Sequence, residues 1–147
     1  GVKLTLNFSS PYWATSLQEF WRKWHITLSQ WLRDYVYFGL GGSRHGVMWI
    51  NLLITFLISG VWHGAGWNYI LWGGLHGLGL IACHYVSFKR VPKLIAWLGT
   101  ILFIGYSWLL FYETDVQAIL VKSLTLFDLS SYSDFSMNSI FGFISLS

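Results

Sequence analysis

Charged residues are scarce in this chain. Of its 147 residues, 9 are lysine or arginine and 6 are aspartate or glutamate, whereas 54% are hydrophobic and 20% are aromatic. An ordinary soluble domain carries about 25% charged residues. The composition therefore excludes that class and predicts a membrane protein. The single cysteine, Cys83, excludes an internal disulfide.

Several common catalytic and metal-binding motifs are also absent. The sequence has no His-Glu-x-x-His, no cysteine pair, no Gly-x-Ser-x-Gly, no P-loop and no dinucleotide-binding glycine fingerprint. Phosphoryl transfer and hydride transfer therefore lack support, and we expect no bound metal, no bound cofactor and no nucleic-acid partner. We interpret His76 and His84 as neutral side chains bonded to neighbouring helices, and His45 as a polar loop residue.

Three long apolar runs predict an all-α, polytopic transmembrane fold. They cover residues 47–62, 67–86 and 94–112, and a membrane span needs about 20 residues. The first two runs are joined by only four residues, which form either a reversal at the surface or a broken helix. A further span is expected to begin at 140–147. Because the sequence does not start with methionine, we expect a piece of a longer protein.

Small residues recur on the first two apolar runs. Gly60 and Gly64, and then Gly73 and Gly77, have the small-xxx-small spacing that lets membrane helices approach each other closely. We therefore assign these glycines to helix packing and not to ligand binding.

Residues 16–38 predict an amphipathic helix lying in the membrane interface. Its apolar side chains recur in steps of three and four, and most charged side chains fall outside that arc. Ser16 and Glu19 fit a capping box at its start. His25 falls within the apolar arc beside Ser29, so its side chain is expected to face lipid or protein.

Basic residues flank the first two runs but are absent from the junction between them. The positive-inside rule places both basic segments in the cytoplasm. One interpretation limits these charges to topology and to attraction of anionic lipid. The other adds binding of a phosphorylated donor by Arg22, Lys23, Arg33 and Arg44, because cationic side chains pair with phosphate oxygens. The two interpretations are compatible.

His63 is the candidate catalytic residue. It lies at the junction between two apolar runs, and an ionisable side chain at membrane depth is a functional candidate by default. A neutral imidazole can accept the proton of a hydroxyl group near pH 7. The position therefore favours a general base.

Five segments occur in a recognisable order. They are residues 7–12 (Asn-Phe-Ser-Ser-Pro-Tyr), 16–29 (Ser-Leu-Gln-Glu-Phe-Trp-Arg-Lys-Trp-His-Ile-Thr-Leu-Ser), 31–37 (Trp-Leu-Arg-Asp-Tyr-Val-Tyr), 40–42 (Leu-Gly-Gly) and 61–64 (Val-Trp-His-Gly). Together they strongly resemble the membrane-bound O-acyltransferase (MBOAT) family, and in particular its bacterial alginate O-acetyltransferase branch. The resemblance runs over residues 7–79 and continues more weakly through 103–127.

The resemblance implies roles for particular residues. In that family the histidine of the Trp-His-Gly motif, here His63 preceded by Trp62, is the catalytic residue. The histidine of the Trp-His-Ile motif, here His25, lies near the donor side of a tunnel through the membrane. We therefore assign His63 and His25 to catalysis. Candidate substrate-binding residues are Trp62, Ser29, Arg22, Lys23 and Arg33.

The resemblance also implies an activity. An acyl group, most simply acetyl from acetyl-CoA, is expected to arrive from the cytoplasm near His25. His63 then promotes its transfer to a hydroxyl on the other side of the membrane. The expected acceptor is an exported polysaccharide such as alginate, reached directly or through a periplasmic acyltransferase partner. The expected location is the bacterial inner membrane, where lipid is a further partner.

Two alternatives remain at this stage. Within the same family, D-alanyl transfer proteins take their acyl group from a carrier protein and modify teichoic acids. Outside it, a transporter can also carry histidines at a broken helix, although it should show internal repeats and paired acids within the membrane. Here Glu113 and Asp115 lie at the end of an apolar run and not inside one.

Overall fold

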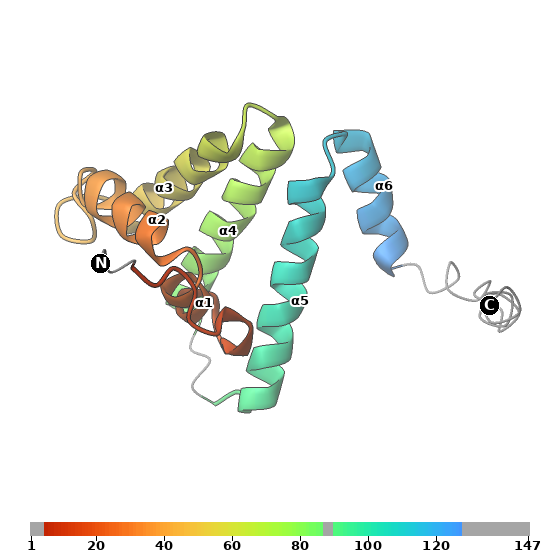
Figure 1. The fold of residues 1–147 in the computed structure, drawn as a ribbon, viewed down its shortest axis with the longest axis horizontal. Coiled ribbons are helices and arrows are strands. Elements are labelled where there is room, and N and C mark those ends of the chain that lie inside the picture. The colour runs from red at the N-terminus through yellow and green to blue at the C-terminus, as the bar shows by residue number, and fades with distance from the viewer. Residues whose placement is uncertain (1–4, 87–89, 128–147) are drawn as a thin grey trace, which may run out of the picture. The chain divides into compact units, whose positions relative to one another are not determined.

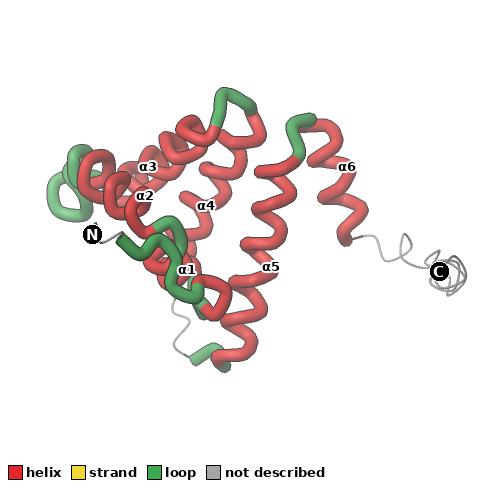
Figure 2. The backbone as a smooth tube through the Cα atoms, viewed as in Figure 1, coloured by secondary structure: helices red, strands yellow, loops and turns green. Residues whose placement is uncertain are grey.

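The computed structural model describes residues 5–86 and 90–127, and every regular element in them is helical (Figures 1 and 2). The predicted all-α class is therefore confirmed, whereas the span predicted at 140–147 lies outside the described residues. One compact unit comprises residues 1–114, and a second comprises 115–147. The elements are η1 (Pro11–Trp13), α1 (Leu17–Lys23), α2 (Ile26–Trp31), the π-helical turn η2 (Leu32–Tyr37), α3 (Met48–His63), α4 (Trp67–Tyr85), α5 (Lys93–Tyr112) and α6 (Val116–Phe127).

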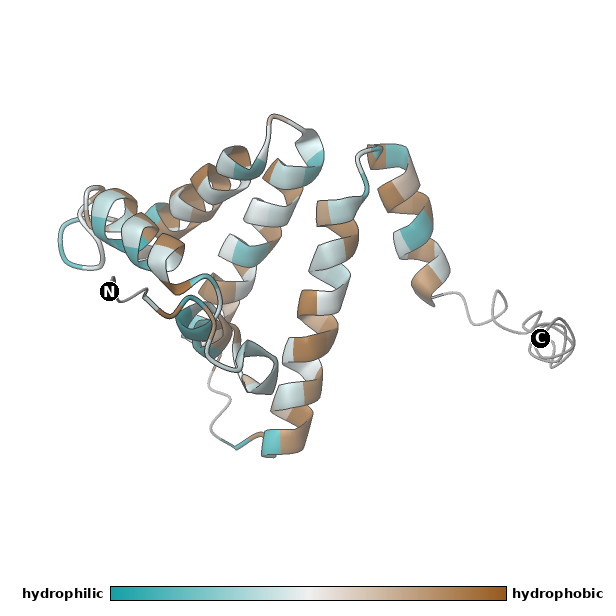
Figure 3. Cartoon of the chain, in the orientation of Figure 1, coloured by the Kyte–Doolittle hydropathy of each residue, from teal (hydrophilic) through white to brown (hydrophobic). Residues whose placement is uncertain are grey.

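Three helices occupy the apolar runs: α3, α4 and α5 begin and end within about one residue of the predicted limits. By length and hydropathy, α5 is the one helix in the described part of the chain that qualifies as a candidate membrane span, and α3 is apolar but shorter. Figure 3 shows hydrophobic residues along α5. The count of three spans stays a prediction.

Helices α3 and α4 run antiparallel and touch through their backbones (Figure 1). A Cβ atom on Gly60 would collide with the carbonyl oxygen of Tyr69, and a Cβ atom on Gly73 would collide with that of Phe56. At Gly77, a Cβ atom would lie 3.0 Å from a methyl carbon of Leu53. The packing role predicted from the glycine spacing is therefore confirmed.

The prediction of a single helix over 16–38 is wrong, because the helix is interrupted at Trp24 and His25. Helix α1 ends before the break and α2 starts after it, and His25 adopts a left-handed backbone with φ 45° and ψ 54°. The amphipathic pattern does not reveal this break, because the groups that stabilise it come from another segment. The N–H of Ser9 donates to the carbonyl of Lys23 at 3.0 Å.

The start of α1 has one of the two bonds of the predicted capping box, and the second bond goes to Thr15 in place of Ser16. The Ser16 hydroxyl accepts the N–H of Glu19 at 3.1 Å, and the Glu19 carboxylate in turn accepts the N–H of Thr15 at 2.8 Å. The ammonium of Lys23, 2.7 Å from that carboxylate, and the Thr15 amide lower the pKa of Glu19 to about 2. Glu19 is therefore ionised throughout the physiological range, and Lys23 is committed to an ion pair.

The segment between η2 and α3 is fixed by one buried amide. Asn51 of α3 donates from its side chain to the carbonyls of Leu40 at 3.0 Å and Gly42 at 2.8 Å. Gly41 and Gly42 both have positive φ, at 97° and 59°, which suits glycine in this turn. These contacts hold η2 against α3.

A small apolar core joins α1 to the long helices. It lies beneath α1, so that the amphipathic segment is seated on α3, α4 and α5 through its apolar side chains. Its buried members are Ala14, Leu17, Phe20, Phe56, Leu80 and Ile104.

The glycine contact makes a testable prediction for the stability of the full-length protein. Gly73→Ala should lower the apparent melting temperature in detergent, because overpacking costs about 1–3 kcal/mol. Gly105→Ala on α5 is the matched control, since a Cβ atom there meets nothing within 4 Å. Equal melting temperatures for the two variants would show that the α3–α4 contact does not limit stability.

Candidate active site

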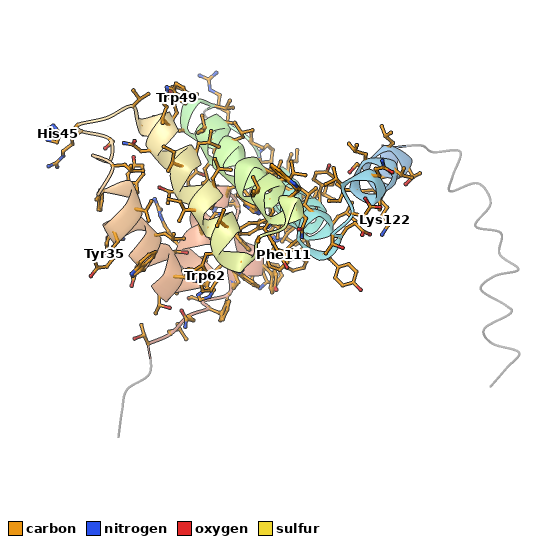
Figure 4. All side chains as sticks on the ribbon, turned by 90° about the horizontal axis from the view of Figure 1, so that it is seen from above. Tyr35, His45, Trp49, Trp62, Phe111 and Lys122 are labelled. Atoms are coloured by element: carbon orange, nitrogen blue, oxygen red, sulfur yellow. The ribbon has the colours of Figure 1, made fainter. Side chains whose placement is uncertain are left out.

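His63 is the last residue of α3 and lies half-buried among aromatic rings. Its ring centroid lies 4.8 Å from that of Trp62, 5.2 Å from Trp72 and 5.0 Å from Phe111. These neighbours come from α3, α4 and α5, and Figure 4 labels Trp62 and Phe111. We call Trp62, Tyr69, Trp72 and Phe111 the aromatic cage of His63. This cage depends on the packing of three helices.

One buried amide holds the wall of this cage. The side chain of Asn68, 1% exposed, donates to the carbonyl of Phe111 at 3.3 Å and so ties the first turn of α4 to the last turn of α5. The ring of Tyr69 packs directly on Gly64, where a Cβ atom would collide with it. The short α3–α4 junction is therefore closely packed next to His63.

The break before α2 brings His25 to the same place. The ring centroid of His25 lies 6.2 Å from that of Trp62, which also contacts His63. Trp62 therefore contacts both imidazoles. The structure thus brings together three of the residues singled out from the sequence, His25, Trp62 and His63, while their roles stay predictions.

Two polar side-chain atoms in this cluster have no hydrogen-bond partner among the described residues. Within the described part of the chain, Nδ1 of His25 and Nε1 of Trp72 are buried and have no hydrogen-bond partner. The great majority of buried polar groups in proteins are paired. The two exceptions both belong to this cluster, because His25 packs against Trp62 and Trp72 packs against His63.

Three of the four remaining predicted residues lie beside a cavity. Arg22, Ser29 and Arg33 line a cavity of about 380 Å³, whereas His25, Trp62, His63 and Lys23 do not. The Ser29 hydroxyl donates to the carbonyl of Trp24 at 3.1 Å and so supports the break. The cavity walls are mainly apolar and include Trp21, Leu52, Phe56 and Leu80.

Three of the predicted cations differ in their pairing. Lys23 is bound to Glu19, and the guanidinium of Arg33 is 2.7 Å from the carboxylate of its neighbour Asp34. Arg22 forms no ion pair with any described residue and is exposed at the cavity. Arg22 is therefore the cation best placed to bind an external anion.

Two tryptophans that sequence reasoning did not single out connect the cavity to the cage. Trp21 lines the cavity, and its ring centroid lies 5.9 Å from that of Trp72, which contacts His63. Trp21 also donates from Nε1 to Nδ1 of His76 at 3.2 Å, which confirms the predicted bonding of His76 to another helix. The sequence does contain a signal for Trp72. Tyr69, Trp72 and His76 recur in steps of three and four, which places their side chains on one face of α4.

The described residues contain no cluster of metal-binding side chains. Across residues 5–86 and 90–127, no three histidine, cysteine, aspartate or glutamate side chains gather in a way that could hold a metal ion.

Residues 4–94 match the model of the MBOAT, membrane-bound O-acyltransferase, family. The chain belongs to this family. It is 44% identical over 127 residues to a peptidoglycan O-acetyltransferase of Helicobacter pylori, covering 81% of this chain and 24% of that protein. It is 39% identical over 122 residues to the probable alginate O-acetylase AlgI of Pseudomonas aeruginosa. This match covers 80% of this chain and 24% of that protein.

A teichoic acid D-alanyltransferase of Streptococcus thermophilus is also similar, at 34% identity over 90 residues, covering 55% of this chain and 22% of that protein. The chain spans about a quarter of the length of these relatives. Members of the MBOAT family are membrane proteins, so the membrane class predicted from composition is confirmed. The family segment includes His25, Trp62, His63 and the cavity arginines.

The pairing of the cations predicts an order of effects on donor binding. In the full-length protein, Arg22→Gln should raise the donor KM by about 10-fold at low salt, as for a lost charge-assisted hydrogen bond, with little change in kcat. Lys23→Gln should have a smaller effect, because Lys23 is already neutralised by Glu19.

Arg44→Gln is the matched control: the sequence also predicts donor binding by Arg44, but this residue is exposed and does not line the cavity. The effect of Arg22→Gln should shrink as salt rises, because salt screens exposed charges. Equal KM values for the Arg22 and Arg44 variants would leave these charges with a role in topology alone.

Proposed function

We propose that the full-length protein is an O-acyltransferase of the bacterial inner membrane that transfers an acetyl group from cytoplasmic acetyl-CoA to a hydroxyl of an exported polysaccharide. One observation carries the proposal. His63 lies half-buried in an aromatic cage at the end of α3, and a backbone break brings His25 against the same tryptophan.

The reaction needs a base at the acceptor hydroxyl. As the hydroxyl oxygen attacks the thioester carbonyl, its proton passes to a ring nitrogen of His63. A carbon–oxygen bond forms and the carbon–sulfur bond breaks. The thiolate of coenzyme A then leaves and takes up the proton from His63. The neutral imidazole is restored, and all atoms are accounted for in the ester and the free thiol.

The surroundings of His63 support this role. The rings of Trp62, Trp72 and Phe111 restrict the approach of water to the imidazole, which favours transfer to the bound hydroxyl over hydrolysis of the donor. His25 adds a second imidazole whose Nδ1 has no partner among the described groups. We assign His25 to orienting the donor, and Trp62 to the contact that joins the two histidines.

The cavity beside α1 and α2 supports a cytoplasmic donor carrying phosphate groups. Arg22 and Arg33 line it, and guanidinium groups suit phosphate oxygens. Ser29 lies on the same lining. A periplasmic partner that receives the acyl group and passes it to the polysaccharide belongs to the same proposal.

D-alanyl transfer from a carrier protein to teichoic acid is the second candidate. It is supported by the similarity to a teichoic acid D-alanyltransferase, at lower identity and over a shorter segment than the similarity to the O-acetylating relatives. The chemistry at His63 would be the same, and the donor would differ. Membership of an acyltransferase family counts against the transporter alternative.

The assignment of His63 predicts a large loss of activity. In the full-length protein, His63→Ala should reduce O-acylation by about 10²- to 10⁴-fold, the usual cost of removing a general base, while expression and detergent extraction stay near wild type. His25→Ala should be less severe. His45→Ala in the exposed loop is the matched control and should leave turnover unchanged.

Turnover is measured with radiolabelled acetyl-CoA and, separately, with a D-alanylated carrier protein. Activity with the D-alanylated carrier protein but not with acetyl-CoA would support D-alanyl transfer and contradict acetyl transfer. Near-normal turnover in a well-folded His63→Ala variant with either donor would contradict the proposed mechanism.

A further inference from the structure

The break between α1 and α2 leaves backbone groups that a continuous helix would have paired internally. In a continuous helix, the N–H groups of Ile26 and Thr27 would donate to carbonyls four residues earlier. At the break, the residue that precedes α2 is His25, and its side chain makes no capping hydrogen bond. Partners for these N–H groups must therefore come from elsewhere in the chain.

Asn7 supplies both partners. Its backbone carbonyl accepts the N–H of Ile26 at 2.9 Å, and its side-chain Oδ1 accepts the N–H of Thr27 at 3.0 Å and the Thr27 hydroxyl at 2.6 Å. One residue, distant in sequence, thus takes the place of the missing cap. Among the described residues, every hydrogen bond of the Asn7 side chain passes through its oxygen.

The segment that carries Asn7 is bound to the residues on both sides of the break and also to α5. Ser9 pairs with the end of α1, and the ring of Phe8 packs edge-on against Trp24 with centroids 4.9 Å apart. Farther along, Nε1 of Trp97 on α5 donates to the carbonyl of Tyr12 at 2.8 Å. The segment is therefore anchored to α5 and braces the break.

We infer that Asn7 is a positioning residue for His25. It selects the broken form of the amphipathic segment over the continuous helix that the sequence pattern favours, and in this way it holds the His25 imidazole against Trp62 and next to His63. Asn7 itself does not touch the reacting groups. The inference rests on the proposed acyl transfer, because His25 acts there.

The role of a single oxygen atom defines the test in the full-length protein. Asn7→Leu keeps the size of the side chain but removes the acceptor, and it should lower kcat by about 5- to 10-fold, as the loss of one capping interaction shifts the population of the competent state. Asn7→Asp keeps the acceptor oxygen and should restore turnover to near wild type. Leu6→Ala, at an exposed neighbour, is the control and should leave turnover unchanged.

A double-mutant cycle shows whether Asn7 acts through His25. In the His25→Ala background, Asn7→Leu should cause no further loss of kcat, because the side chain that it positions is already absent. A further loss of 5-fold or more in that background would overturn the inference, and so would full turnover in the single Asn7→Leu variant.

A milder variant covers the case in which Asn7→Leu does not accumulate. Thr27→Val removes the hydroxyl donor to Asn7 but leaves the N–H donor, so kcat should fall by a smaller factor, and this loss too should vanish in the His25→Ala background. An unchanged loss there would overturn the inference. If His63→Ala is inactive while Asn7→Leu is fully active, the proposed function stands and only the role of Asn7 fails.

Discussion

The contact between the backbones of α3 and α4 is the constraint on which the site depends. With glycine at positions 60 and 73, no side chain separates the two helices, and each Cα region lies against a carbonyl of the other helix. This proximity lets one face of α4 present Trp72 to His63. It also places Asn68 where its amide reaches the end of α5 and closes the aromatic cage.

A second constraint acts at the break between α1 and α2. The amphipathic segment gives up the hydrogen bonds of a continuous helix and replaces them with bonds to residues 7–9 and to Ser29. The left-handed backbone of His25, which is unfavourable for a side chain other than glycine, persists because its surroundings determine it. Two elements far apart in sequence thereby meet at Trp62. The cavity beside α1 and α2 and the histidine cluster are separate, and the pair of Trp21 and Trp72 joins them.

Much of the fold follows from local patterns, and the site follows only in part. The apolar runs predicted α3, α4 and α5, and the glycine spacing predicted the close packing of α3 and α4, because both signals lie within single helices. The i,i+4 spacing of Glu19 and Lys23 could also have shown that Lys23 is paired. The break at His25 could not be predicted from the amphipathic pattern, because its stabilising partners are supplied by a separate segment. For the same reason, the sequence did not show how the candidate residues are grouped, whereas the structure divides Arg22, Ser29 and His63 between a cavity and an aromatic cage.

The central claim is that His63 accepts the proton of the acceptor hydroxyl. The most direct measurement is chemical rescue of the full-length His63→Ala protein by a series of small imidazoles that differ in basicity, with acyl transfer followed at saturating donor. General-base catalysis predicts that the rescued rate rises with the pKa of the added imidazole. Rescue that is independent of basicity, or an acetylated imidazole accumulating in place of the ester product, would contradict the account.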